Sequence, residues 1–398
     1  MAARASVYLL IIAGLGYCLA WLIRAEPPMR DPVMMAVFAQ EAHDAVNNVR
    51  KDKGLTALSD HQQLLQSLRF YVESGRLDSG RLEDVFAHVE RGLPKVHELA
   101  VNLVYDRNQD AILAQLQEWE DLRYGQHTHY AAWLFRDPES RALGCLAVLA
   151  RELPQLELPI RVDANAPAFF DTCKLCGEGH GVSLARQSQN TLIVTCPHCE
   201  RPYNLIATDA SGWWRRANQF FGGTPSPKLD PELNRVDQLM ALWKNVAAKC
   251  QYRTDAQRVF GSDSWELPIE TYRNGHGDCE DTSLLLVDLL IDRGFEARVA
   301  LGRHQGDGHA WVVVREGEKS YLLESTWEDI DELTEPPLLE ELAFDYEPKY
   351  LFDKTALYFL KQSDWTGDYW SEKRWSRVEY ESAEKEVEIP DPEIAATE

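Results

Sequence analysis

Hydrophobic residues recur at helical spacing through much of the first third of the chain. Apolar positions three or four apart, as at Leu64 and Leu68, form the one-sided stripe of an amphipathic helix. Pro32 directly after Asp31 has the N1 and N-cap arrangement that begins a helix. The pattern therefore predicts an all-α helical domain over residues 30–160, with a structural role or a protein partner.

A long apolar run precedes this region. Residues 5–23 carry no charge and are mostly apolar, with Arg4 before them and Arg24 after them. At about 1.5 Å per residue, such a run just crosses a hydrocarbon core of roughly 30 Å. A cleaved signal peptide is the alternative, but no clear small-x-small cleavage site follows. We predict a transmembrane signal anchor over residues 1–25, which contacts the lipid bilayer through residues 5–23.

The predicted anchor implies where the protein is located. With one anchor, we expect the chain to be a single-pass membrane protein. Anchors of this shape usually leave the following domain outside, so we expect the soluble part to be exported, to the periplasm or the extracellular space. Zinc thiolates and a free catalytic cysteine would instead favour the cytosol.

Four cysteines stand in two C-x2-C pairs separated by 19 residues: Cys173 with Cys176, and Cys196 with Cys199. Zinc takes four soft ligands in a tetrahedron, and two facing C-x2-C turns supply them. Two disulfides are the alternative. The pattern resembles a zinc ribbon, so it predicts a zinc-ribbon-like module over residues 161–208 that holds a structural Zn²⁺ ion.

Glycine and proline mark the next boundary. Residues 222–227 read Gly-Gly-Thr-Pro-Ser-Pro, which is typical of a linker. We therefore expect a linker over residues 209–230 and a further domain over residues 231–365. An acidic tail over residues 366–398 follows, because its last 18 residues hold seven acidic residues and one Lys.

Cys279 stands at the start of a predicted helix. Asp278 before it is an N-cap candidate, and a run over residues 284–291 follows that is apolar except at Asp288. A helix N-terminus stabilises a thiolate, so we expect the pKa of Cys279 to be lowered. Glu280 and Asp281 oppose the thiolate, so a neighbouring imidazolium would have to offset them.

Two strands joined by a short turn follow, over residues 309–314 and 320–324. With Gly317 and Glu318 as the turn, paired positions sum to 317 + 318 = 635. His309 then lies diagonally from Glu324 on the same face, close enough for a carboxylate to orient an imidazole. Together with Cys279, this gives the nucleophile, base and orienting acid of acyl transfer.

The blocks Gly277–Asp281, Gly308–Val312 and Leu323–Thr326 resemble the transglutaminase-like superfamily, including the bacterial transglutaminase-like cysteine peptidases. The resemblance covers about a third of the chain. It implies a papain-like α+β fold for residues 231–365. The family's third catalytic residue is usually Asp, and this sequence has the longer Glu. Carried over, the resemblance gives the nucleophile, the general base and acid, and the orienting acid as Cys279, His309 and Glu324.

The sequence thus predicts a multidomain chain: an N-terminal transmembrane helix, an all-α helical region, a small zinc ribbon and a papain-like α+β transglutaminase-like domain. The expected function is that of a membrane-anchored cysteine peptidase or amidase acting on proteins or peptides through a thioester acyl-enzyme. One alternative is a protein-glutamine acyltransferase, in which an amine resolves the thioester. Another is a non-catalytic scaffold or adaptor.

The charge excludes one class of partner. The chain has 64 acidic and 41 basic residues, a formal net charge of −23. Binding to a phosphate backbone needs clustered Lys and Arg. We therefore expect no nucleic-acid partner.

Overall fold

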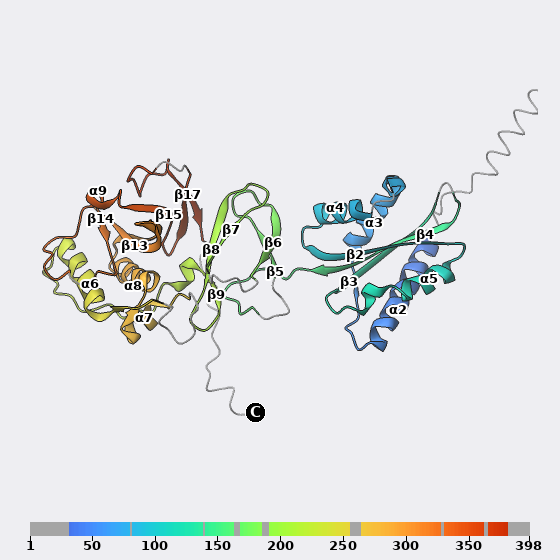
Figure 1. The fold of residues 1–398 in the computed structure, drawn as a ribbon, viewed down its shortest axis with the longest axis horizontal. Helices are drawn as coiled ribbons and strands as arrows, with labels where there is room; N and C mark the ends of the chain where they lie inside the picture. Colours follow the sequence, from blue (N-terminus) through green and yellow to red (C-terminus); the bar gives the residue numbers. More distant parts are fainter. Residues whose placement is uncertain are drawn as a thin grey trace, which may run out of the picture. The chain divides into compact units, whose positions relative to one another are not determined.

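The computed structural model describes residues 32–79, 82–137, 140–162, 168–184, 191–254, 264–327, 330–361 and 365–380 (Figure 1). The chain divides into two compact units, Met1–Pro154 and Gln155–Glu398.

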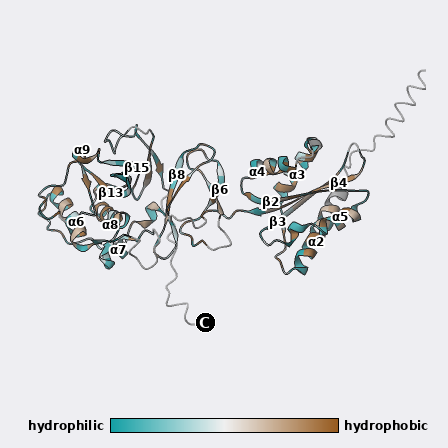
Figure 2. Ribbon diagram, viewed as in Figure 1, coloured by the Kyte–Doolittle hydropathy of each residue, from teal (hydrophilic) through white to brown (hydrophobic). Residues whose placement is uncertain are grey.

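The first unit contains a four-stranded sheet in the order β1-β3-β4-β2, in which β4 pairs antiparallel with both of its neighbours. The strands are β1 (Ser59–Asp60), β2 (Val96–Asp106), β3 (His129–Arg136) and β4 (Leu143–Glu152). The helices are α2 (Pro32–Asp52), α3 (Gln62–Glu73), α4 (Leu82–Gly92) and α5 (Gln109–Gln117), with the 3₁₀ turns η1 (Arg76–Ser79) and η2 (Glu120–Arg123). Along α2, hydrophobic and hydrophilic residues are mixed, as for a helix with one buried face (Figure 2).

Helices cover both faces of this sheet. In β4, Cys145 and Ala147 pack in one core with α2 and α5, whereas Leu146 and Val148 pack in another core with α3 and α4. A strand buried on both faces is apolar at every position, so it loses the two-residue alternation that reveals a strand. The expectation of an all-α region over residues 30–160 is therefore wrong.

Among the described residues, which begin at residue 32, no helix is long and apolar enough to cross a membrane. This finding overturns the expectation of a single-pass membrane protein with an exported soluble part. The predicted anchor, residues 5–23, lies outside the described residues.

The second unit begins with two small antiparallel sheets around the four cysteines. One pairs β5 with β6, and the other has the order β7-β8-β9. Their bounds are β5 (Ala168–Thr172), β6 (Gly179–Ser183), β7 (Thr191–Thr195), β8 (Pro202–Thr208) and β9 (Trp214–Arg216), and the 3₁₀ turn η3 (Ala217–Phe220) follows.

The rest of the second unit is built on a six-stranded antiparallel sheet in the order β14-β13-β12-β15-β16-β17. The strands are β12 (Glu296–His304), β13 (Asp307–Glu316), β14 (Lys319–Leu323), β15 (Tyr346–Phe352), β16 (Ala356–Leu360) and β17 (Trp375–Glu379). The helices are α6 (Arg235–Lys249), α7 (Pro268–Asn274), α8 (Cys279–Asp292) and α9 (Leu339–Leu342), and the short strands β10 (Gln251–Tyr252) and β11 (His276–Gly277) pair with each other.

The central helix of this unit is α8, which packs against β12 and β13 and against α6 (Figure 1). Every residue from Leu284 to Leu290 is buried, so the apolar run of the sequence becomes a helix enclosed on all sides. The combination of helices with an antiparallel sheet agrees with the α+β class expected for residues 231–365.

Two predicted boundaries differ from the structure. The expected linker over residues 209–230 contains β9, which pairs with β8, and its Trp214 and Phe220 are buried. The expected tail over residues 366–398 contributes β17 to the edge of the large sheet. In both segments, aromatic residues find a core that local composition does not reveal.

Candidate active site

The first turn of α8 is fixed by reciprocal capping. Asp278 is the N-cap, and its side chain accepts a hydrogen bond from the backbone N–H of Asp281. The carboxylate of Asp281 in turn accepts from the backbone of Asp278, at 3.2 Å, and of Glu266, at 2.7 Å. Gly277 is required beside this cap, because a Cβ atom there would lie 2.7 Å from the Cβ of Asp281. Cys279 is thus held as the first helical residue, as the sequence predicted.

The predicted hairpin register is confirmed. Val312 pairs with Leu323 and Val313 with Leu322, so paired positions sum to 635. This register brings His309 to Glu324: His309 Nε2 and Glu324 Oε2 are 2.8 Å apart. The side chain of His309 is 16% exposed and that of Glu324 is 2% exposed, so the contact between them is largely shielded from solvent.

The Glu324 carboxylate is held by partners on both oxygens. Oε1 accepts hydrogen bonds from the backbone N–H of Thr326, at 3.1 Å, and from its hydroxyl, at 2.7 Å. Oε2 accepts from the Tyr346 hydroxyl, at 3.1 Å, as well as facing His309. These contacts hold the Glu324 carboxylate beside His309, although Glu is one methylene longer than the Asp that the family usually has.

These partners keep Glu324 ionised. Burial raises its pKa, but the hydrogen bond and charge of His309 and the hydrogen bonds from Thr326 outweigh burial, and the pKa lies below its usual value. An ionised carboxylate only accepts hydrogen bonds, so His309 Nε2 carries a proton. In the neutral ring, Nδ1 then has the lone pair that can accept a proton.

The thiol of Cys279 has a different partner from the one expected. Its Sγ donates to the carboxylate of Glu280, with Sγ and Oε2 2.8 Å apart. Burial raises the pKa of this thiol well above its usual value, and the Glu280 and Asp278 carboxylates raise it further. A hydrogen bond with the backbone of Ala310 only partly opposes them. The expectation of a lowered pKa is wrong for this conformation, because burial and two carboxylates raise the pKa of the thiol.

Ser325 ties the nucleophile helix to the end of β14. Its hydroxyl is 3.0 Å from the Thr282 hydroxyl and 2.9 Å from the Ser283 hydroxyl, both in the first turns of α8. One residue earlier, the carbonyl of Glu324 accepts a hydrogen bond from Trp243 Nε1, at 3.1 Å. The helix that carries Cys279 and the strand that leads to Glu324 are therefore held in a fixed relation.

Tyr346 is a site residue that sequence reasoning missed. It begins β15 and is 1% exposed, and its ring lies against Trp311 and His309. Tyr346 contacts Glu324 although the two residues are 22 positions apart in the sequence. No local pattern marks it, because its place depends on how β15 pairs with β12.

Comparison with known proteins identifies this part of the chain. The profile of the family described as bacterial transglutaminase-like cysteine proteinase matches residues 223–337, which include Cys279, His309 and Glu324. The domain is a transglutaminase-like cysteine peptidase. The predicted resemblance to the transglutaminase-like cysteine peptidases is confirmed. The match supports an enzyme and not the alternative of a non-catalytic scaffold or adaptor. A peptidase of this family suggests a protein or peptide substrate.

Comparisons with solved structures and with curated proteins give less information about this chain than the family profile does. The Legionella pneumophila protein LapG, EGTA-treated, is 20% identical with a TM-score of 0.28, over 35% of this chain and 74% of that chain. A second LapG structure is 20% identical with a TM-score of 0.25, over 32% and 75%. At these TM-scores the likenesses do not bear on fold or function. The search of curated proteins returned no match.

Upstream of the peptidase domain, the four predicted metal ligands come together. The Sγ atoms of Cys173, Cys176, Cys196 and Cys199 all lie within 4.8 Å of one another. All four cysteines are free thiols, so the alternative of two disulfides is wrong. Cys173 and Cys199 are 3.8 Å apart, and Cys176 and Cys196 are 3.7 Å apart. Four sulfurs at about 2.3 Å from a tetrahedral ion are separated by about 3.8 Å, so this cluster fits a metal ion.

The two C-x2-C turns have the same construction. In the first, the backbone N–H of Gly177 donates to the carbonyl of Cys173, and in the second that of Glu200 donates to the carbonyl of Cys196, both at 2.9 Å. Gly177 has a φ angle of +78° and Glu200 one of +58°. In both turns the residue after the second cysteine therefore adopts the left-handed conformation, and the two turns have the same backbone shape.

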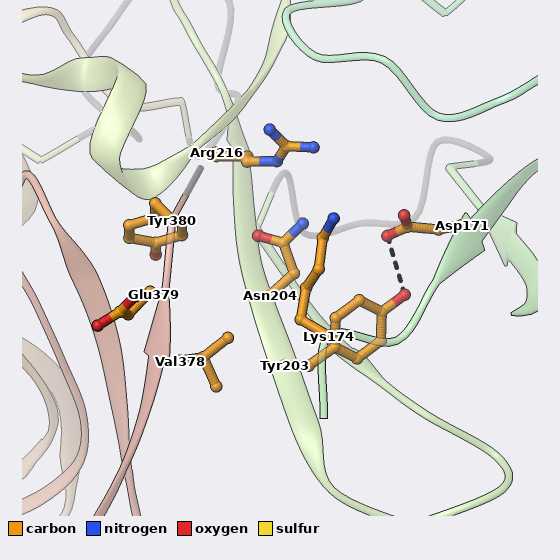
Figure 3. Close-up of a pocket in the computed structure, with 8 residues that line it drawn as sticks. All are labelled: Asp171, Lys174, Tyr203, Asn204, Arg216, Val378, Glu379 and Tyr380. Carbon is orange, nitrogen blue, oxygen red and sulfur yellow. Dashed lines mark hydrogen bonds between the residues drawn. The ribbon is translucent and has the colours of Figure 1, made fainter. Parts of the chain in front are cut away.

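Polar side chains line a small pocket beside the four cysteines, between β8 and β17 (Figure 3). There the Tyr203 hydroxyl donates to Asp171, at 2.9 Å, and lies 3.1 Å from His180 Nε2. Asp171 and His180 face each other across the β5–β6 pair. The Tyr203 bridge therefore ties β8 to this hairpin and stabilises the four-cysteine module.

Proposed function

We propose that this protein hydrolyses peptide bonds through a thioester acyl-enzyme, with Cys279 as nucleophile, His309 as general base and acid, and Glu324 as orienting acid. The observation that carries the proposal is the contact of 2.8 Å between His309 Nε2 and the buried Glu324 carboxylate. Because Nε2 of His309 carries the proton shared with Glu324, the other ring nitrogen, Nδ1, is free to accept the proton of the Cys279 thiol.

The chemistry follows from these roles. Sγ of Cys279 bonds to the scissile carbonyl carbon while its proton passes to Nδ1 of His309. The tetrahedral intermediate expels the amine, which takes that proton, and the thioester remains. Water then attacks the thioester and gives a proton to His309, and the thiol recovers it as the C–S bond breaks. Backbone N–H groups in the first turn of α8 are suited to stabilise the oxyanion.

Glu280 has to release the thiol first. In the conformation described, the thiol proton points at the Glu280 carboxylate, which favours the neutral thiol. The proposed proton transfer to His309 therefore requires rotation of the thiol or of Glu280. A substrate that displaces Glu280 would permit this rotation.

A digest of a quenched fluorescent peptide library, with products read by mass spectrometry, tests the proposal. The full chain should cleave peptides, and Cys279→Ala and His309→Ala should lower cleavage by at least about 100-fold. Cys250→Ala, which removes another buried thiol, is the matched control and should cleave normally. Full activity in Cys279→Ala would refute the assignment.

A glutamine-containing peptide with a fluorescent primary amine distinguishes hydrolysis from acyl transfer. Release of the free acid without incorporation of the amine supports the proposed peptidase. Incorporation that exceeds hydrolysis would instead support the acyltransferase alternative.

We further propose that the four-cysteine cluster holds a structural Zn²⁺ ion. The sulfur separations of 3.7 and 3.8 Å and the matched turns support it. Four thiolates complete the coordination of zinc and leave no open position, so the ion would stabilise the fold and not take part in catalysis. Metal analysis of protein purified without chelator should give one zinc per chain, and less than about 0.5 would contradict the proposal.

A further inference from the structure

We propose that His304, His309 and Glu324 form a second metal site, for a late first-row divalent ion such as Zn²⁺, and that occupation of the site inhibits the peptidase. The inhibition rests on the proposed function, whereas the site itself rests on geometry. Among the residues that the structure describes, this is one of two groups whose ligand atoms lie within 4.8 Å of one another; the four cysteines are the other.

The sheet register places the two histidines together. Gly302 on β12 pairs with His309 on β13, so His304, two residues further along β12, is the diagonal neighbour of His309 on the same face. The two imidazole centroids are 5.6 Å apart. His304 thus reaches the group from the neighbouring strand and not from the hairpin that carries His309 and Glu324.

Two further features fix His304 in this position. It pairs directly with Tyr346 across the β12–β15 ladder, and the two rings lie 4.2 Å apart between centroids. Gly302 has no space for a side chain, because a Cβ atom there would lie 2.1 Å from the carbonyl oxygen of Glu347. No side chain therefore stands between His304 and His309 on this face.

The donor set selects the class of ion. Two imidazoles and one carboxylate suit zinc and neighbouring transition metals, whereas calcium and magnesium prefer oxygen ligands. Glu324 is buried, with its Oε2 2.8 Å from His309 Nε2. Small rotations of the two half-buried histidines would bring three ligands to one ion.

Occupation of this site would remove the base of the proposed reaction. A neutral imidazole that binds a metal through Nε2 carries its single proton on Nδ1. His309 would then have no lone pair for the Cys279 proton. Inhibition follows from this change of tautomer and needs no movement of the fold.

The test counts bound metal. Equilibrium dialysis against Zn²⁺ uses the full chain with Cys279→Ala, which removes the nearby thiol as a competing ligand. It should bind one zinc beyond the ion proposed for the four cysteines. Addition of His304→Gln should weaken this binding by at least about tenfold, whereas the control His61→Gln in the first unit should not. Absence of the additional zinc, or binding that His304→Gln leaves unchanged, would overturn the proposal.

Activity supplies the second readout. Zn²⁺ should inhibit the chain with an intact Cys279, EDTA should reverse the inhibition, and His304→Gln should cleave normally but resist Zn²⁺ by at least about tenfold. Equal inhibition of both chains would show that the ion acts elsewhere, which refutes the inhibitory role. If no peptide is cleaved at all, the dialysis result still decides the metal site, and only the proposed function fails.

Discussion

The thiol of Cys279 donates its hydrogen bond to the carboxylate of the next residue, Glu280, across 2.8 Å. The cysteine that the sequence marks as the nucleophile is therefore held as a neutral thiol in the conformation described. Under the proposed mechanism, Cys279 becomes reactive only after its hydrogen bond to Glu280 is broken.

Glu280→Gln is expected to make Cys279 more reactive. The substitution removes a negative charge and an ionised acceptor that raise the thiol pKa. A hydrogen bond to a charged group contributes about 1.5 kcal/mol or more, so alkylation by iodoacetamide near neutral pH should be about tenfold faster. Mass spectrometry of the labelled peptide measures the rate. Glu318→Gln, in the exposed turn of the hairpin, is the control, and an unchanged rate in Glu280→Gln would contradict the role of Glu280.

The unmodified chain should show a shifted pH profile of alkylation. Since burial and two carboxylates raise the Cys279 pKa, its thiolate forms only above the pH range of an ordinary thiol. The labelling rate should therefore be slow at mildly acidic pH and still be rising beyond the range in which a free cysteine peptide has levelled off. Fast labelling of Cys279 at mildly acidic pH would show that the dominant conformation in solution differs.

Substitution of Glu324 should lower turnover more than substrate binding. Glu324→Gln removes the charge that stabilises the imidazolium formed on His309, so kcat should fall by about 100-fold. Glu324→Asp is one methylene shorter and cannot serve both Thr326 and His309 from the same backbone position. Steady-state kinetics on a cleaved peptide checks both variants, and an Asp variant as active as the parent would argue against this geometry.

Tyr346→Phe tests a positioning residue. The substitution removes one hydrogen bond to Glu324 and leaves the ring in place against His304 and Trp311. Loss of about 1 kcal/mol predicts a fall in kcat of about fivefold with KM unchanged. A rise in KM alone would instead place Tyr346 in substrate binding, and thermal unfolding of the variant shows whether the fold is intact.

Loss of one cysteine ligand should unfold the four-cysteine module. Zinc binding to comparable peptides contributes about 10 kcal/mol or more, so Cys196→Ser should lower zinc content and expose residues 168–208 to proteolysis. His198→Ala is the control: His198 lies in the same turn and is exposed, and its backbone N–H, which donates to the Cys196 sulfur, is kept in the variant. It should keep its zinc, and equal zinc loss in both variants would contradict the four-cysteine ligand set.

The sequence alone determined the features that depend on neighbours along the chain. The Asp278 cap and the apolar run that follows specify α8, and the Gly317–Glu318 turn specifies the pairing that brings His309 to Glu324. The spacing within each C-x2-C pair likewise predicts the cluster of four cysteines. Each is a short-range effect of capping, turn chemistry or register, so a local pattern suffices.

Only the tertiary structure decided the rest. The strand β4 was hidden because burial on both faces removes its alternation. His304 reaches the site through pairing of β12 with β13, and Tyr346 through pairing of β15 with β12. The raised pKa of Cys279 arises from burial and from the direction of the Glu280 side chain. These properties depend on residues distant in the chain or on the dielectric of the folded interior, which no local pattern of residues encodes.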